Sequence, residues 1–159
     1  MRSLVLGLVM CVGGFMSTGA FADDGGANEV ESEGLPKTIY MVVWRGCEEA
    51  CEGFQSYLKD SGVSAKVIVR DANRNKSKLD SFVEEAKSLN PDLVITWGTS
   101  VSKGVIGTIE EYGNATKLGA IPVLFMIVAD PIGANIVASY EDSGRKTVTG
   151  IRNRIPDEV

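Results

Sequence analysis

From Lys37 onward, apolar residues recur along the chain in two alternating patterns. Continuous apolar runs are typical of strands covered on both faces, and apolar positions three or four residues apart are typical of amphipathic helices. Runs of the first kind predict strands at residues 38–44, 65–69, 93–97 and 122–128. A helix is predicted after each of the first three strands. The first has its apolar positions at Cys47, Ala50, Cys51, Phe54, Tyr57 and Leu58, and the second at Leu79, Phe82, Val83, Ala86 and Leu89. The third has them at Val101, Val105, Ile106, Ile109 and Tyr112.

Strands separated by single helices predict an α/β fold with a parallel sheet, because each crossover must be right-handed. We expect three layers, α-β-α, with the flavodoxin-like strand order 2-1-3-4 and helices on both faces. Gly62 should end the first helix, and Asn90-Pro91 the second. In such folds ligands bind beyond the carboxyl ends of the strands, where the strand order reverses. That point lies here between the first and third strands.

The residues that follow these two strands are the candidate ligand site. They are Trp44-Arg45-Gly46 after the first strand and Trp97-Gly98-Thr99-Ser100 after the third. We expect the two indoles to lie side by side at one edge, where their faces could stack on an aromatic group or hold a cation. Asp130 and Pro131 follow the fourth strand, and the Asp130 carboxylate could receive an ammonium group.

A carboxylate would suit the same edge. The first-turn N–H groups of the third helix, with the Thr99 or Ser100 hydroxyl, can bind an anion, and Arg45 could hold it bidentately. Each residue also has a purely structural interpretation. The tryptophans could cover the core, Thr99 or Ser100 could cap the helix, Asp130 could start a turn, and Arg45 could pair with Glu48 or Glu49.

Two cysteines four residues apart, Cys47 and Cys51, leave three alternatives open. Their phase with Phe54 favours packing of both side chains against the sheet. In an oxidising compartment they could instead form a disulfide, since Cα atoms at this spacing are within bonding range. The third alternative is a redox function, because thiols near a helix N-terminus have a lowered pKa.

Composition and absent motifs narrow the function classes. Hydrophobic residues make up 44% of the chain and charged residues 23%, as in ordinary soluble domains. A net charge of -5 gives no basic field to attract nucleic acid. The chain has no histidine, which removes Ser-His-Asp and Cys-His catalysis and His-bearing zinc sites. Residues 98–104 lack the spacing of a nucleotide-binding loop. We therefore expect no enzyme activity, cofactor or metal.

The first 22 residues predict a signal peptide for export. Arg2 supplies a positive start, residues 4–15 are apolar, and Ala20-Phe21-Ala22 matches a cleavage site before Asp23. The apolar stretch is shorter than the ~20 residues that span a bilayer. Residues 23–36 carry five acids and no apolar periodicity, so we expect a disordered lead-in to a single domain.

Residues 39–150 resemble the tryptophan/tyrosine-type substrate-binding proteins of ABC transporters, which have the type I periplasmic-binding fold. The resemblance rests on the order of four short motifs: Gly98-Thr99, Pro122-Val123, Asp130-Pro131-Ile132-Gly133 and Val148-Thr149-Gly150. It implies a periplasmic protein that captures a solute between two lobes and delivers it to a membrane permease and its ATPase.

Members of that family are about twice as long as this chain. The resemblance therefore implies that residues 37–150 form the first lobe and that residues 151–159 begin a second, truncated lobe. The solute would be an amino acid or a similar zwitterion. Two alternatives are an exported thiol protein that uses Cys47 and Cys51, and a stand-alone flavodoxin-like binding module.

Overall fold

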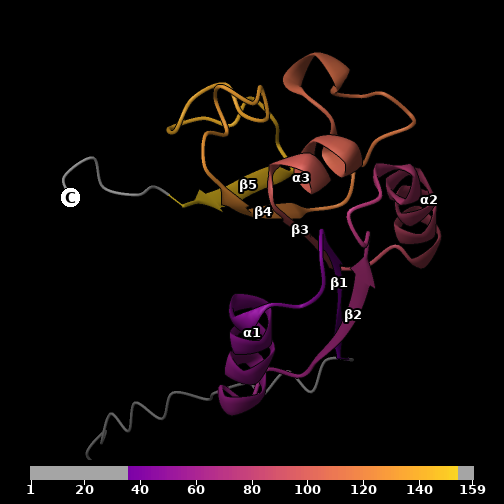
Figure 1. Cartoon of the computed structure of the whole chain (residues 1–159), viewed down its shortest axis with the longest axis vertical. Helices are drawn as coiled ribbons and strands as arrows, with labels where there is room; N and C mark the ends of the chain where they lie inside the picture. Colours follow the sequence, from indigo (N-terminus) through magenta and orange to yellow (C-terminus); the bar gives the residue numbers. More distant parts are fainter. Residues whose placement is uncertain (1–35, 154–159) are drawn as a thin grey trace, which may run out of the picture. The chain divides into compact units, whose positions relative to one another are not determined.

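The computed structural model describes residues 36–153, which form a five-stranded parallel sheet with order β2-β1-β3-β4-β5 (Figure 1). The strands are β1 (Lys37–Val43), β2 (Ala65–Asp71), β3 (Leu93–Trp97), β4 (Val123–Val128) and β5 (Val148–Arg152), and the helices are α1 (Glu49–Asp60), α2 (Leu79–Leu89) and α3 (Thr99–Ile106). Short 3-10 turns span Lys76–Lys78 and Ile109–Glu111. The predicted α/β class and the order 2-1-3-4 are confirmed. The predicted signal peptide, and residues 23–35 of the lead-in, lie outside the described residues.

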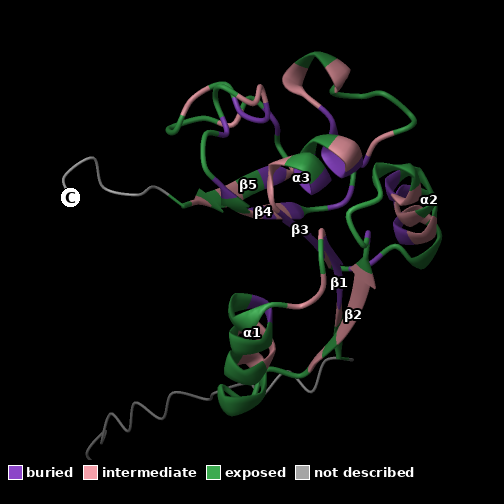
Figure 2. Ribbon diagram, in the orientation of Figure 1, coloured by how far each residue is buried: buried purple, intermediate pink, exposed green. Residues whose placement is uncertain are grey.

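Helices cover both faces of the sheet, as expected. On one face, α1 packs against β1 and β3 through a cluster that contains Met41, Cys51 and Ile95. On the other face, α2 and α3 pack through a larger cluster that includes Val83 and Val105. Figure 2 shows that the central strands β1 and β3 are buried while α1 is largely exposed. None of the helices in the described range is long and apolar enough to cross a membrane.

The sequence pattern did not predict β5. Gly150 interrupts this five-residue segment, and glycine weakens a strand signal. Its lack of a side chain is required here, because a Cβ at residue 150 would lie 2.3 Å from the Phe125 ring of β4. Ile151 and Arg152, expected to begin a second lobe, pair in the sheet with β4. Residues 154–159 fall outside the described part of the chain.

Two helix boundaries differ from the prediction. The third helix was expected to continue to Tyr112, but Gly107 adopts a φ of 71° and ends α3 at Ile106. The first helix was expected to bury Cys47 and Ala50, but α1 begins at Glu49, so Cys47 precedes it and Ala50 is exposed. The end of α2 is as predicted, because Asn90 takes the left-handed conformation and Pro91 follows.

A polar network links α2 to the sheet. The buried Tyr40 hydroxyl donates to Glu85 Oε2 at 2.7 Å, and Arg70 Nε donates to the same oxygen at 2.8 Å. The hydrogen bonds from Arg70 are the main reason that the pKa of Glu85 is lowered, with those from Tyr40 also contributing. Burial, together with Glu85, raises the pKa of Tyr40. The Glu85 carboxylate is therefore shared between a cation and a buried phenol.

A buried arginine connects the β4–β5 crossover to α3. Arg145 is 5% exposed and donates from Nη1 to the Ile106 carbonyl and from Nη2 to the Gly107 carbonyl, both at 3.0 Å. These carbonyls lie at the carboxyl end of α3, where a cation complements the helix dipole. Arg145 thereby holds the helix whose opposite end borders the candidate site.

Candidate functional site

The two predicted strand ends meet at one edge of the sheet. Strands β1 and β3 are parallel neighbours, with Val42 paired to Thr96. Trp44-Arg45-Gly46 and Trp97-Gly98-Thr99-Ser100 therefore follow adjacent strands at their carboxyl ends. This is the place where the strand order reverses, since β2 lies on one side of β1 and β3 on the other.

The two indoles, however, do not lie side by side. Trp97 is 7% exposed and belongs to the cluster beneath α1, whereas Trp44 is half-buried against the cluster on the α2 and α3 face. Continuing the β1–β3 register, Trp97 lies beside Val43, and Trp44 lies beside Gly98. Successive strand residues point to opposite faces, so the expected indole pair is wrong. Of the two tryptophans, only the half-buried Trp44 remains a candidate for contact with a ligand.

The first turn of α3 is open at this edge. Gly98 is its N-cap residue, with a φ of 93° that favours glycine, and no side chain among residues 36–153 caps the helix. The Ser102 hydroxyl donates to the Gly98 carbonyl at 2.9 Å and shares a 2.9 Å hydrogen bond with the Thr96 hydroxyl. This buried pair positions the turn. Thr99 is half-exposed and Ser100 is exposed, and neither hydroxyl serves as the cap.

Arg45 and Asp130 both make local contacts. Arg45 Nε lies 2.8 Å from Glu48 Oε1, and both side chains are about half exposed. Asp130 Oδ1 accepts the Gly133 N–H at 2.8 Å, which closes the turn that begins at Pro131. A Cβ at Gly133 would come 2.1 Å from Asp130 Oδ2. Arg45 therefore pairs with Glu48 and Asp130 starts a turn, as their purely structural interpretations predicted. Both side chains nevertheless remain exposed to solvent.

A disulfide joins Cys47 and Cys51, with their Cα atoms 5.2 Å apart. Cys51 is also fully buried in the α1-side cluster, so bonding and core packing occur together. Gln55 Nε2 donates to Cys47 Sγ at 3.2 Å. Because Cys47 closely follows Trp44, Arg45 and Gly46, the bond attaches this site loop to the first turn of α1.

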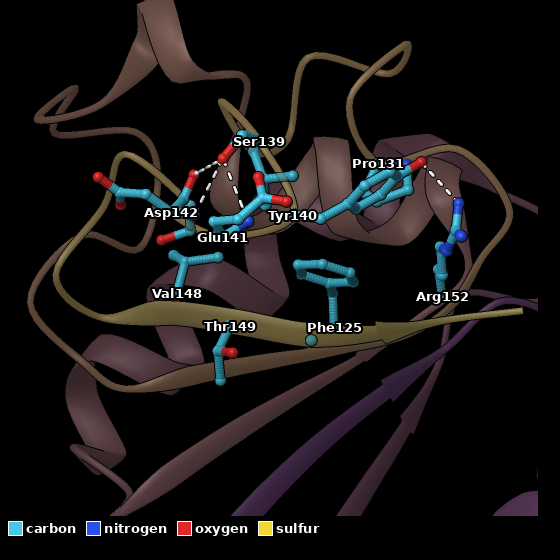
Figure 3. A pocket seen from close by; sticks show the side chains of 12 residues that line it. Phe125, Pro131, Ser139, Tyr140, Glu141, Asp142, Val148, Thr149 and Arg152 are labelled. Atoms are coloured by element: carbon cyan, nitrogen blue, oxygen red, sulfur yellow. Dashed lines mark hydrogen bonds between the residues drawn. The ribbon is translucent and has the colours of Figure 1, made fainter.

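Two cavities border the candidate residues. One, of about 390 Å³, lies beside Thr99 and Ser100 and is also lined by Lys76 and Lys103. The other, of about 520 Å³, lies between β5 and the crossover that precedes it (Figure 3). Pro131 lines this second cavity together with Phe125, Tyr140 and Arg152, three residues that the sequence analysis did not select. A strand assignment for residues 148–152 would have placed Arg152 at the carboxyl edge.

Comparison with known proteins identifies the family. Residues 39–158 match the family described as ABC transporter substrate binding protein. The chain belongs to this family. Its members are generally not enzymes and typically act outside the cytoplasm. No curated protein sequence matches the chain.

Three solved structures share the fold of this family member. The ligand-free, open structure of CD0873 from Clostridium difficile, a substrate binding protein with adhesive properties, has a TM-score of 0.64 at 19% identity, covering 77% of this chain and 40% of that one. An ABC domain in complex with L-Trp from Streptococcus pneumonia gives 0.61 at 22%, with 75% and 39% covered. A conserved domain protein from Vibrio cholerae gives 0.63 at 20%, with 77% and 40% covered. The family member described here thus spans about 40% of the length of each matched structure.

Proposed function

We propose that this chain forms one wall of the ligand cleft in the solute-binding component of an ABC-type import system. It would capture a small molecule in the periplasm and deliver it to a membrane permease with its ATPase. The observation that carries the proposal is the first turn of α3, which lies at the switch point of the parallel sheet and which no side chain of the described part of the chain caps. A binding role without catalysis agrees with the family.

The ligand we infer is an amino acid or a similar zwitterion. Free N–H groups at a helix N-terminus, beside the hydroxyls of Thr99 and Ser100, suit a carboxylate. The exposed carboxylate of Asp130 follows the neighbouring strand and suits an ammonium group, and the half-buried Trp44 offers an indole face. The Streptococcus protein with the same fold was solved with L-Trp, which supports this ligand class.

The second wall of the cleft is part of the proposal. Solute capture of this kind depends on two lobes that close around the ligand. This chain covers about 40% of the length of its structural neighbours, so we expect its affinity for the ligand to be low when it is tested by itself. The experiment must therefore detect weak binding.

An amide-resolved NMR titration of the chain with individual amino acids meets this requirement. Binding should shift the amide resonances of Thr99 and Ser100, and the Thr99→Val/Ser100→Ala variant should weaken binding at least tenfold. Because neither hydroxyl caps α3, this variant should keep its melting temperature. The matched control is Ser56→Ala/Thr149→Val, at exposed positions elsewhere. Equal affinity in both variants, or no response to any amino acid, would overturn the proposal.

Export is proposed from the first 22 residues, by cleavage before Asp23. The N-terminal sequence of the protein recovered from a periplasmic fraction tests this directly. A mature chain that starts at Asp23 is expected, and an intact Met1 would contradict export by a cleaved signal peptide.

An exported thiol protein is the second candidate, and the Cys47–Cys51 disulfide favours it. Full burial of Cys51 opposes it, because thiol exchange needs an accessible sulfur. A Cys47→Ala/Cys51→Ala variant separates the two functions. Unchanged amino-acid binding by this variant supports the solute-binding role, whereas thiol–disulfide exchange activity in the parent chain that is lost in the variant would support the thiol role.

A further inference from the structure

The loop that follows β2 begins at the same carboxyl edge as the candidate site, and its backbone is tied to the end of β1. The Ala72 N–H donates to the Val43 carbonyl at 2.9 Å, and the Arg74 N–H donates to the Trp44 carbonyl at 2.7 Å. Arg74 is therefore fixed next to Trp44, the half-buried tryptophan of the site. The sequence analysis did not select this arginine.

The backbone of Arg74 has a conformation that arginine rarely adopts. Its φ is 58°, and the preceding Asn73 has a φ of 50°. Asparagine tolerates this left-handed region, but it is strained for other residues that carry a Cβ. The Asn73 N–H donates to Asp71 Oδ1 at 2.7 Å, which helps to hold the loop in this form. Strained residues cluster at ligand sites, so an arginine at this position requires a functional explanation.

The guanidinium of Arg74 is exposed and has no acceptor within residues 36–153. The other arginines of this range each contact an acceptor: Glu48 for Arg45, Glu85 for Arg70, the Ile106 and Gly107 carbonyls for Arg145, and the Tyr140 hydroxyl for Arg152. Arg45, which the sequence predicted to hold a carboxylate, is thus occupied by Glu48. Beside Trp44, Arg74 is the arginine that can take this role.

The edge from Arg74 to the first turn of α3 spans two strand spacings. Trp44 lies beside Gly98 in the continued β1–β3 register, and Arg74 bonds to Trp44 from the side of β2. Because neighbouring strands lie about 4.8 Å apart, the backbones of Arg74 and of the α3 turn are separated by roughly 10 Å. The long side chain of an arginine covers much of this distance. A small ligand held at the α3 turn therefore has its far end within reach of the guanidinium.

The cavity of about 390 Å³ beside Thr99 and Ser100 has an excess of positive charge. Its charged lining residues are Lys76, Lys103, Lys117 and Asp80. Lys76 follows Arg74 by two residues, so the positive charge continues along the same loop. The whole chain has a net charge of -5, which makes this local excess unusual. A positive potential in a cavity favours a ligand that carries net negative charge.

We propose that Arg74 binds a side-chain carboxylate of the ligand, and that the solute is an acidic amino acid. The α-carboxylate lies at the first turn of α3, and the Arg74 guanidinium donates to the second carboxylate in the bidentate geometry that this pair favours. Trp44, between the two, packs against the methylene groups. This inference rests on the proposed function, since it adds a contact to the same site.

NMR titrations with L-glutamate and with L-glutamine test the inference, because the two differ in side-chain charge but hardly in shape. The parent chain should bind glutamate at least tenfold more tightly than glutamine. Arg74→Gln should remove this preference and leave the affinity for glutamine unchanged. The matched control, Lys66→Gln at the exposed opposite end of β2, should keep the preference.

The results separate this inference from the proposed function. If the parent chain binds neutral amino acids as tightly as glutamate, the role of Arg74 is refuted and the proposed function stands. If the chain binds no amino acid, both fail.

A glycine variant distinguishes ligand contact from a structural role. Glycine adopts the left-handed conformation without strain, so Arg74→Gly should not lower the melting temperature, yet it should lose the preference for glutamate. Asn73→Gly, at the neighbouring left-handed residue, should keep the preference. A preference retained in Arg74→Gly, or lost equally in Asn73→Gly, would overturn the assignment of Arg74.

Discussion

Trp44 and Trp97 follow neighbouring strands at one edge of the sheet, yet they pack on opposite faces. Trp97 is 7% exposed beneath the α1 side, and Trp44 is half-buried on the side of α2 and α3. Alternation along the strands produces this separation. The two residues therefore differ in role. Trp97 contributes to the hydrophobic core, whereas the fluorescence of Trp44 can respond to ligand binding at the carboxyl edge of the sheet.

Fluorescence quenching should distinguish the two tryptophans. In Trp97→Phe the remaining indole, at residue 44, should be quenched by acrylamide. In Trp44→Phe the remaining indole should emit at shorter wavelength and be at least several-fold less accessible to the quencher. Similar quenching in both variants would contradict the burial of Trp97.

Glu85 should make stability depend on pH in the acid range. Its pKa is lowered in the folded state from the ordinary value of 4.5, chiefly by hydrogen bonds from Arg70. The stabilisation is therefore complete above the unfolded pKa and is lost as pH falls through the lower, folded value. Urea unfolding measured at intervals below pH 5 should show this loss in the parent chain. Glu85→Gln should flatten the profile, and Glu84→Gln, on the same helix, should not.

Arg145 should be more important to stability than other arginines. Arg145→Met leaves the Ile106 and Gly107 carbonyls without their donor and is expected to cost about 2 to 4 kcal/mol of unfolding free energy. Arg145→Lys should recover only part of it, since one ammonium cannot reproduce two guanidinium bonds. Arg45→Met, at an exposed position, should change stability by less than about 0.5 kcal/mol. Equal effects at both positions, measured by urea unfolding, would refute the assigned role.

Reduction of the Cys47–Cys51 bond should cost about 2 kcal/mol, the entropy expected for so short a closed loop. Denaturant unfolding with and without a phosphine reductant measures this difference. In a Cys11→Ser background, iodoacetamide should label the protein only after reduction. Labelling of the native, unreduced protein at either residue would show that the bond does not form.

The pattern of apolar residues was sufficient to predict the central strands and helices of the parallel sheet. Strand β3 and helix α2 have the predicted bounds, because each lies between clear start and stop signals such as Asn90-Pro91. Strand β5 was not predicted, because Gly150 is explained only by the Phe125 ring above it. The early end of α3 was missed for a similar reason, since the sequence does not show which glycines adopt a positive φ.

The candidate site was also predicted only in part from the sequence. Adjacent strand order was enough to bring residues 44–46 and 97–100 to one edge, because parallel strands all end on the same side. The direction of each side chain was not predicted. Arg45 could have faced a ligand, but its contact is Glu48, and Asp130 closes a turn onto Gly133.

The sequence by itself determined the order of elements, the parallel sheet and the edge where the candidate residues gather, because these follow from local periodicity and the handedness of crossovers. Only the tertiary structure decided which face each tryptophan packs on, that Cys47 and Cys51 are bonded as well as buried, and that β5 completes the sheet. These outcomes depend on contacts between residues far apart in the chain, and no local pattern of apolar and polar positions records them.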